Sequence, residues 1–157
     1  MSRQRRVEHP NREKPASRTM RMVVVAILVL SGALITITTL RGWDLMQEAR
    51  SLNVVFVAIH VVFVVQVLRW SRGVLPMAAG VAAFIAIFAG SSVSSWYERD
   101  AAGYADASLS GQLGLVTVVI LGVQIAVILV TIAAFGQRWQ EEVEQATPST
   151  PAHAAAS

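Results

Sequence analysis

The sequence predicts an all-α integral membrane protein, with four transmembrane helices in an up-down bundle and both termini in the cytoplasm. Three observations lead to this fold class. Of the 157 residues, 54% are hydrophobic and 15% are charged, and the mean hydropathy is +0.54, whereas soluble domains carry roughly 25% charged residues. The apolar residues gather in four long stretches, and a tryptophan follows each of them.

Each stretch is long enough to cross a hydrocarbon core about 30 Å thick, which takes roughly 20 helical residues. None contains Asp, Glu, Lys or Arg, so no charged side chain has to enter the lipid. The first stretch is longer than the apolar part of a signal peptide, roughly 7–15 residues, and no A-x-A-like cleavage site follows it, so we expect it to stay in the mature protein. The predicted spans are residues 22–40, 51–68, 74–93 and 113–135.

These spans form one transmembrane domain over residues 22–136, which two cytoplasmic segments flank. Residues 1–21 are rich in arginine, and we expect them to form a largely disordered basic arm. Residues 137–157 begin with a polar stretch, which we expect to extend the fourth helix to about residue 145. They end in a Pro-rich tail that is too poor in apolar residues to fold.

The four tryptophans are expected to anchor the spans at the membrane surface. Each one falls just beyond the C-terminal end of a span. Tryptophan prefers the headgroup layer, where its ring meets apolar atoms and its N–H meets water. The predicted interface anchors are Trp43, Trp70, Trp96 and Trp139.

The distribution of Lys and Arg predicts the orientation. Ten of these residues fall in the N-terminal arm, the second connection and the tail, and three fall in the first and third connections. Positive charge favours the cytoplasmic side, so both termini are expected inside, in the plasma membrane. Because the net charge of +3 comes from the arm rather than from a folded face, we expect no nucleic-acid partner.

The third span carries small residues at every fourth position, which favours close helix packing. In lipid, such residues let two helix backbones approach each other. Packing against a neighbouring span is the first interpretation, and docking onto a partner protein is the second. The stripe consists of Ala78, Ala82, Ala86 and Gly90, and Ser94 continues it.

Polar residues near the middle of the spans form a candidate site. His60 is the one ionisable residue inside a span, and an imidazole in lipid needs a hydrogen-bond partner. Gln124 lies at a similar depth in the fourth span, so we expect the two side chains to meet and to form a hydrogen bond. We expect this polar pair to have a structural role. The alternatives are a proton path, a haem ligand or a lipid headgroup site. The candidate midplane site comprises His60, Gln124, Asn53, Thr117 and Thr131, and the first span adds Ser31.

Several functional classes are excluded or disfavoured by missing residues. The chain has no cysteine, so it has no disulfide, thiolate nucleophile or Cys-based metal site. A bis-histidine haem needs two intramembrane histidines, so His60 would need a second copy of the chain, and we expect no cofactor. No intramembrane carboxylate and no HExxH motif is present, and Ser31 with His60 is the single pair that could serve a serine protease. We therefore expect no enzyme and no metal site.

Two functions from different classes remain. The first is a small accessory or scaffolding subunit that packs its small-residue stripe against a larger membrane complex. The alternative is a carrier or sensor that binds a lipid, a quinone or another small molecule at the midplane site. The expected partners are the lipid bilayer and another membrane protein or a second copy of the chain. The connection over residues 94–112 is a further candidate, either for docking an external partner or for binding a cation through Glu98, Asp100 and Asp106.

Overall fold

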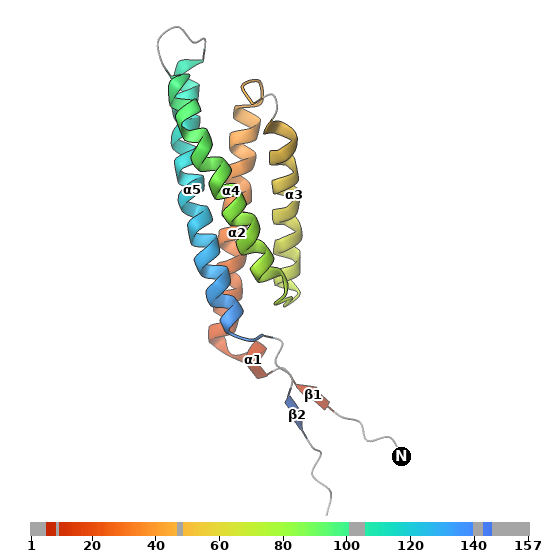
Figure 1. The fold of residues 1–157 in the computed structure, drawn as a ribbon. Helices are drawn as coiled ribbons and strands as arrows, with labels where there is room; N and C mark the ends of the chain where they lie inside the picture. Colours follow the sequence, from red (N-terminus) through yellow and green to blue (C-terminus); the bar gives the residue numbers. More distant parts are fainter. Residues whose placement is uncertain (1–5, 9, 47–48, 101–105, 140–142, 146–157) are drawn as a thin grey trace, which may run out of the picture.

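Four long helices make up most of the described part of the protein (Figure 1). The structure is a computed structural model, and it describes residues 6–8, 10–46, 49–100, 106–139 and 143–145. All four helices are long and apolar enough to cross a membrane, which confirms the predicted helical membrane class. The helices are α2 (Pro15–Arg41), α3 (Ala49–Leu68), α4 (Val74–Glu98) and α5 (Ala107–Gly136).

All four helices are longer than the apolar stretches that predicted them, and α3 differs least, by two residues at its start. α2 begins at Pro15 rather than at residue 22, and α4 ends at Glu98 rather than at residue 93. α5 begins at Ala107, six residues before the predicted span. Apolar composition marks only the part of a helix that can lie in hydrocarbon, whereas backbone hydrogen bonds continue the helix into the headgroup layer. Pro15 fits the first turn of α2, where its missing N–H costs no hydrogen bond.

The four helices pack unevenly. α4 packs most extensively against α5, while α2 contacts both α3 and α5. α3 and α4 follow each other in the chain but touch at few points. Successive helices run in opposite directions in Figure 1. α2 is therefore the helix that joins α3 to the α4–α5 pair.

Glycine permits the closest approach between α4 and α5. A Cβ atom at Gly114 would lie 3.2 Å from Trp96 Cβ and 3.3 Å from Tyr97 Cζ. A Cβ atom at Gly42, just after α2, would lie 3.0 Å from Leu113 Cδ1. A side chain at either position would have to push these neighbouring atoms aside. The two glycines therefore allow Trp96 of α4 to be buried against α2 and α5.

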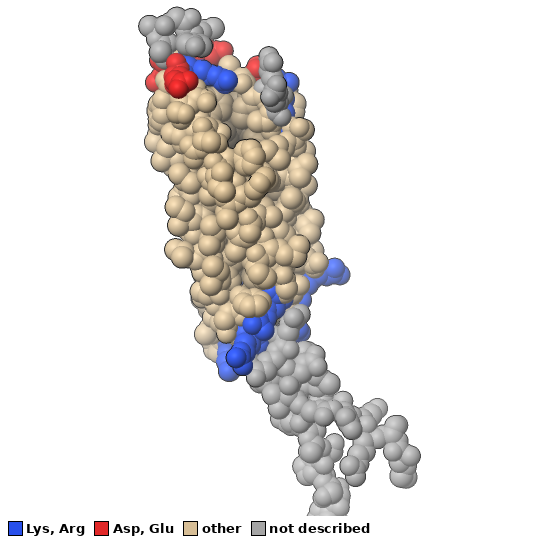
Figure 2. Space-filling view, in the orientation of Figure 1, with Lys and Arg blue, Asp and Glu red and all other residues tan. Residues whose placement is uncertain are grey.

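Charged side chains are confined to the two ends of the bundle, and an uncharged belt separates them (Figure 2). We call the end with Arg12, Arg21 and Arg72 the basic end, and the end with Arg99 and the acidic residues Asp44, Glu98, Asp100 and Asp106 the acidic end.

Arginines at the basic end bind the carbonyl oxygens that helices leave unpaired at their C-termini. Arg21 Nη1 donates to Leu68 O at the end of α3, over 3.3 Å, and the guanidinium lies 4.1 Å from the centre of the Trp70 ring. Arg72 Nε donates to Phe135 O near the end of α5, over 3.0 Å. Each contact satisfies a carbonyl and places positive charge at the negative end of a helix dipole.

The terminal segments differ from the sequence prediction. The helical extension expected over residues 137–145 is wrong, because α5 ends at Gly136 and Arg138 has a φ of 48°. Part of the arm expected to be disordered is ordered: β1 (Arg6–Glu8) pairs antiparallel with β2 (Val143–Gln145), and α1 (Pro10–Glu13) precedes α2. Arg12 Nε also donates to Trp139 O over 3.2 Å, which ties the two ends of the chain together.

We predict that Gly114→Leu destabilises the bundle, while Gly122→Leu on the same helix does not. A leucine at Gly114 must displace Trp96 or Tyr97, and overpacking of this kind costs about 1–3 kcal/mol. Gly122 has no atom within 4 Å of where its Cβ would lie. Thermal unfolding in detergent measures both variants, and equal midpoints for the two would contradict the close approach at Gly114.

Candidate functional site

The midplane polar residues form a hydrogen-bonded chain across three helices. Ser31 of α2 lies between the two residues that the sequence singled out. Its Oγ is 2.9 Å from His60 Nε2 on α3 and 2.7 Å from Gln124 Nε2 on α5. All three side chains are buried, and Ser31 and Gln124 are 0% exposed.

The direction of these hydrogen bonds follows from their partners. His60 Nδ1 is 2.8 Å from Phe56 O, a carbonyl that can only accept, so Nδ1 carries the hydrogen. With a neutral imidazole, Nε2 then accepts from the Ser31 hydroxyl, and the Ser31 oxygen accepts from the Gln124 amide. Gln124 Oε1 is buried and has no hydrogen-bond partner among the described residues.

The structure brings together only part of the predicted midplane site. His60 and Gln124 lie near each other as expected, but Ser31 links them, because α2 lies between α3 and α5. Thr117 and Thr131 donate to carbonyls of their own helix, Leu113 O and Val127 O. Asn53 lies elsewhere, and its Nδ2 contacts Met46 Sδ at 3.7 Å. No sequence pattern distinguishes Ser31 from the other hydroxyl residues of α2, because its role as a link depends on which helices lie beside it.

The Ser31–His60 pair resembles the nucleophile and base of a hydrolase, but its surroundings do not suit catalysis. A nucleophile must reach a substrate carbonyl, and donors must face the oxyanion that forms. Ser31 is completely buried and lines neither of the two described pockets. Its oxygen already accepts from Gln124, so the pair serves helix packing in this arrangement.

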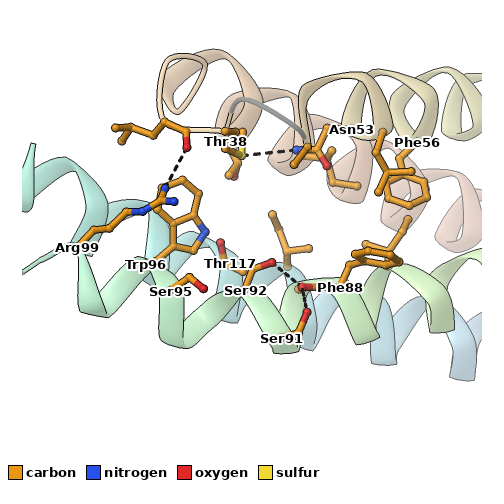
Figure 3. Close-up of a pocket in the computed structure, with 18 of the residues that line it drawn as sticks. Thr38, Asn53, Phe56, Phe88, Ser91, Ser92, Ser95, Trp96, Arg99 and Thr117 are labelled. Carbon is orange, nitrogen blue, oxygen red and sulfur yellow. Dashed lines mark hydrogen bonds between the residues drawn. The ribbon is translucent and has the colours of Figure 1, made fainter.

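A cleft of about 770 Å³ lies between α3 and α4 in the half of the bundle nearer the acidic end (Figure 3). It exists because α3 and α4 make few contacts, and α2 and α5 form its floor. The surface is visibly hollowed near this end in Figure 2. Two of the predicted midplane residues, Asn53 and Thr117, line this cleft, whereas His60 and Gln124 do not.

The lining of this α3/α4 cleft changes from charged to apolar along its length. Arg99 lies at one end, beside Trp96, and Phe56 and Phe88 lie at the other (Figure 3). Polar residues occupy the part between them. They are Thr38, Asn53, Ser91, Ser92, Ser95 and Thr117.

The small-residue stripe of α4 passes from a buried to an exposed face. Four residues turn through about 400°, so each step of the stripe moves about 40° round the helix axis. Ala78 and Ala82 are both 2% exposed, Ala86 is half-buried, and Gly90 is exposed. The bundle contact instead continues through Ile85 and Ala89.

The side of α4 opposite this contact is exposed. We call the surface formed by Gly80, Ala83, Ile87 and Gly90 the α4 free face, and the large exposed side chains of Met77 and Phe84 flank it. A Cβ atom at Gly80 or Gly90 would meet no atom within 4 Å, so the bundle itself does not require glycine there.

Two of the four tryptophans are too deeply buried for the surface role that the sequence predicts. Trp43 is 42% exposed and Trp70 is half-buried. Trp96 and Trp139 are 5% and 0% exposed, so they close the two ends of the bundle from within. The Trp139 indole N–H donates to Gln137 Oε1 over 2.9 Å, and its ring meets the Trp70 ring edge to face. The position of a tryptophan just after a span therefore does not predict whether its side chain is exposed or buried.

The third connection supports no metal site in the part that the structure describes. Within the described residues, no group of three or more His, Cys, Asp or Glu side chains could hold a metal ion, and this includes Glu98, Asp100 and Asp106. Residues 101–105 of this connection lie outside the described residues. Comparisons with protein-family models, with characterised proteins and with solved structures find no match to this chain.

We predict that Ser31→Ala destabilises the bundle more than Thr117→Val. The alanine removes two interhelical hydrogen bonds, each worth about 0.6 kcal/mol in membrane proteins, so the loss should be about 1–2 kcal/mol. Thr117 donates to its own helix, so its hydroxyl holds no helices together. Denaturation of the protein in mixed micelles measures both, and an equal cost would show that Ser31 does not link the helices.

Proposed function

We propose that this protein is a non-catalytic accessory or scaffolding subunit that binds another membrane protein through the α4 free face. The observation that carries this proposal is the row of small residues on the side of α4 that faces away from the bundle. A helix surface turned only towards lipid needs no small residues, because lipid tails conform to large side chains equally well.

Small residues in a transmembrane helix allow another backbone to come close, and this is the main source of helix association in lipid. Gly80 and Gly90 are ten residues apart and point about 80° apart round the helix axis, with Ala83 between them, so a crossing helix could contact this side of α4 over several turns. Ile87, which is 70% exposed, projects from this face, and the exposed Met77 and Phe84 flank it. The partner is therefore a transmembrane helix of a different protein, with a second copy of this chain as the other outcome.

The proposed orientation places both termini in the cytoplasm of a cell whose plasma membrane holds the protein as an up-down bundle. The distribution of charge supports it, since the basic end carries the arginines of the N-terminal arm and of the α3–α4 connection. The acidic end, with Asp44, Glu98 and Asp100, then faces outwards.

The alternative function, a carrier or sensor with a ligand between His60 and Gln124, has less support. The space between these residues holds Ser31, and no described pocket reaches them. Gln124 Oε1, which is buried without a hydrogen-bond partner among the described residues, favours an additional small polar partner there, such as a water molecule.

We predict that Gly90→Leu releases the protein from its complex. A leucine there fills the groove that a partner helix would enter, and the stability of the isolated bundle should not change, since nothing lies within 4 Å. Mild detergent extraction followed by size analysis and mass spectrometry measures the complex. The wild type should elute with a stoichiometric membrane protein, and Gly90→Leu should reduce that partner at least tenfold.

Gly122→Leu is the matched control, because Gly122 is also exposed and open but lies on α5. It should keep the partner. Recovery of the wild type as a monomer without any partner would overturn the proposal, and so would an equal loss of partner in both variants.

We predict that cysteines introduced at the two ends of the bundle react with a thiol reagent from opposite sides of the membrane. Only the introduced cysteine can react, because the chain has no cysteine of its own. Glu98→Cys should react with a membrane-impermeant thiol reagent on intact cells. Ser71→Cys, in the α3–α4 connection, should react only after the cells are permeabilised. The opposite pattern would reverse the proposed topology.

A further inference from the structure

The α3/α4 cleft has the features of a lipid-binding site. We propose that it binds one phospholipid of the outer leaflet, with the phosphate at Arg99 and an acyl chain against Phe56 and Phe88. This site is separate from the α4 free face and does not depend on the proposed protein partner.

Shape and size fit a chain-like ligand. Pockets for small ligands range over about 300–1,000 Å³, and this one has about 770 Å³. It extends along α4 from Arg99 to Ile85, which is about 20 Å of helix, or about two thirds of a hydrocarbon core about 30 Å thick. This depth corresponds to the hydrocarbon of one leaflet together with part of its headgroup layer. The cleft opens along the side of the bundle because α3 and α4 are apart.

The polarity of the lining runs in the same direction as that of a lipid. The charged end lies at the acidic end of the bundle, where headgroups are expected, and the aromatic end lies near mid-helix (Figure 3). Phe56 lines the apolar end, and its carbonyl accepts from His60, so the buried hydrogen-bonded chain begins where the cleft stops. An acyl chain would thus meet only apolar groups below the serines.

Two polar side chains in the cleft have hydrogen-bonding capacity to spare. Arg99 has five N–H donors, and its one side-chain hydrogen bond among the described residues runs from Nη1 to Leu45 O over 3.0 Å. Its guanidinium lies 5.6 Å from the centre of the Trp96 ring, which holds it over the cleft. Asn53 makes only the 3.7 Å contact with Met46 Sδ, a weak acceptor.

These groups match the parts of a phospholipid in order of depth. The free donors of Arg99 suit phosphate oxygens, and the Asn53 amide, deeper in the cleft, suits an ester carbonyl. Asp44 also lines the charged end, and no ion pair joins it to Arg99 among the described residues. A zwitterionic headgroup with a phosphate and an ammonium group satisfies both charges.

The test measures lipid binding to the delipidated full-length protein by native mass spectrometry. The two probes are phosphatidylethanolamine and diacylglycerol with the same acyl chains, which differ by the phosphate-containing headgroup. The wild type should bind one phosphatidylethanolamine and should bind diacylglycerol at least tenfold more weakly, since charge-assisted hydrogen bonds are lost. Arg99→Gln should lower the first affinity to the level of the second, and Arg99→Lys should retain much of it.

A second pair of variants tests the cleft itself. Ser92→Phe fills the cleft from α4 and should abolish binding, whereas Ser51→Phe changes an exposed residue of α3 outside the cleft and should not. Equal binding of the two probes by the wild type would overturn the phosphate assignment. Equal binding by the two phenylalanine variants, or a partner protein cross-linked within the cleft in place of lipid, would overturn the site.

Discussion

The arrangement of this bundle depends on one constraint, that a polar side chain within hydrocarbon has to find its hydrogen bonds inside the protein. The Ser31 hydroxyl provides a hydrogen-bond partner to polar side chains of two other helices at once, His60 on α3 and Gln124 on α5. The hydroxyls of Thr117 and Thr131 meet this constraint locally, on carbonyls of α5. Only the first kind of solution joins helices, and because α2 lies between α3 and α5, Ser31 can link the two predicted partners.

The central place of α2 has a consequence for the other side of the bundle. α3 is held by α2, and α4 is held by α5 through close contacts at Gly114, while α3 and α4 touch at few points, among them the edge-to-face contact of the Phe56 and Phe84 rings. The cleft between them is therefore a product of how the other pairs pack. Ser91 and Ser92 both donate to Phe88 O of their own helix, whereas Arg99 and Asn53 keep hydrogen-bonding capacity to spare.

The small residues of α4 are spread over more than one face. Ala78 and Ala82 pack inside the bundle, while Gly80 and Gly90 face away from it. A repeat of four residues drifts steadily round a helix with 3.6 residues per turn, so a stripe with this spacing cannot stay on one contact surface. Internal packing therefore accounts for the first part of the stripe, and docking is our proposal for the exposed part.

The sequence alone determined the helical membrane class and the number and approximate position of the helices, because hydropathy over 18 or more residues depends only on local composition. It also identified His60 and Gln124 as residues that need partners, since a polar group in lipid is costly wherever the helix lies. Only the tertiary structure decided that Ser31 joins them, that Trp96 and Trp139 are buried, and that Asn53 lines a cleft instead of the midplane. These features depend on which helices are neighbours and how each is rotated about its axis, and a linear pattern of apolar residues that is nearly uniform around each helix carries little information about either.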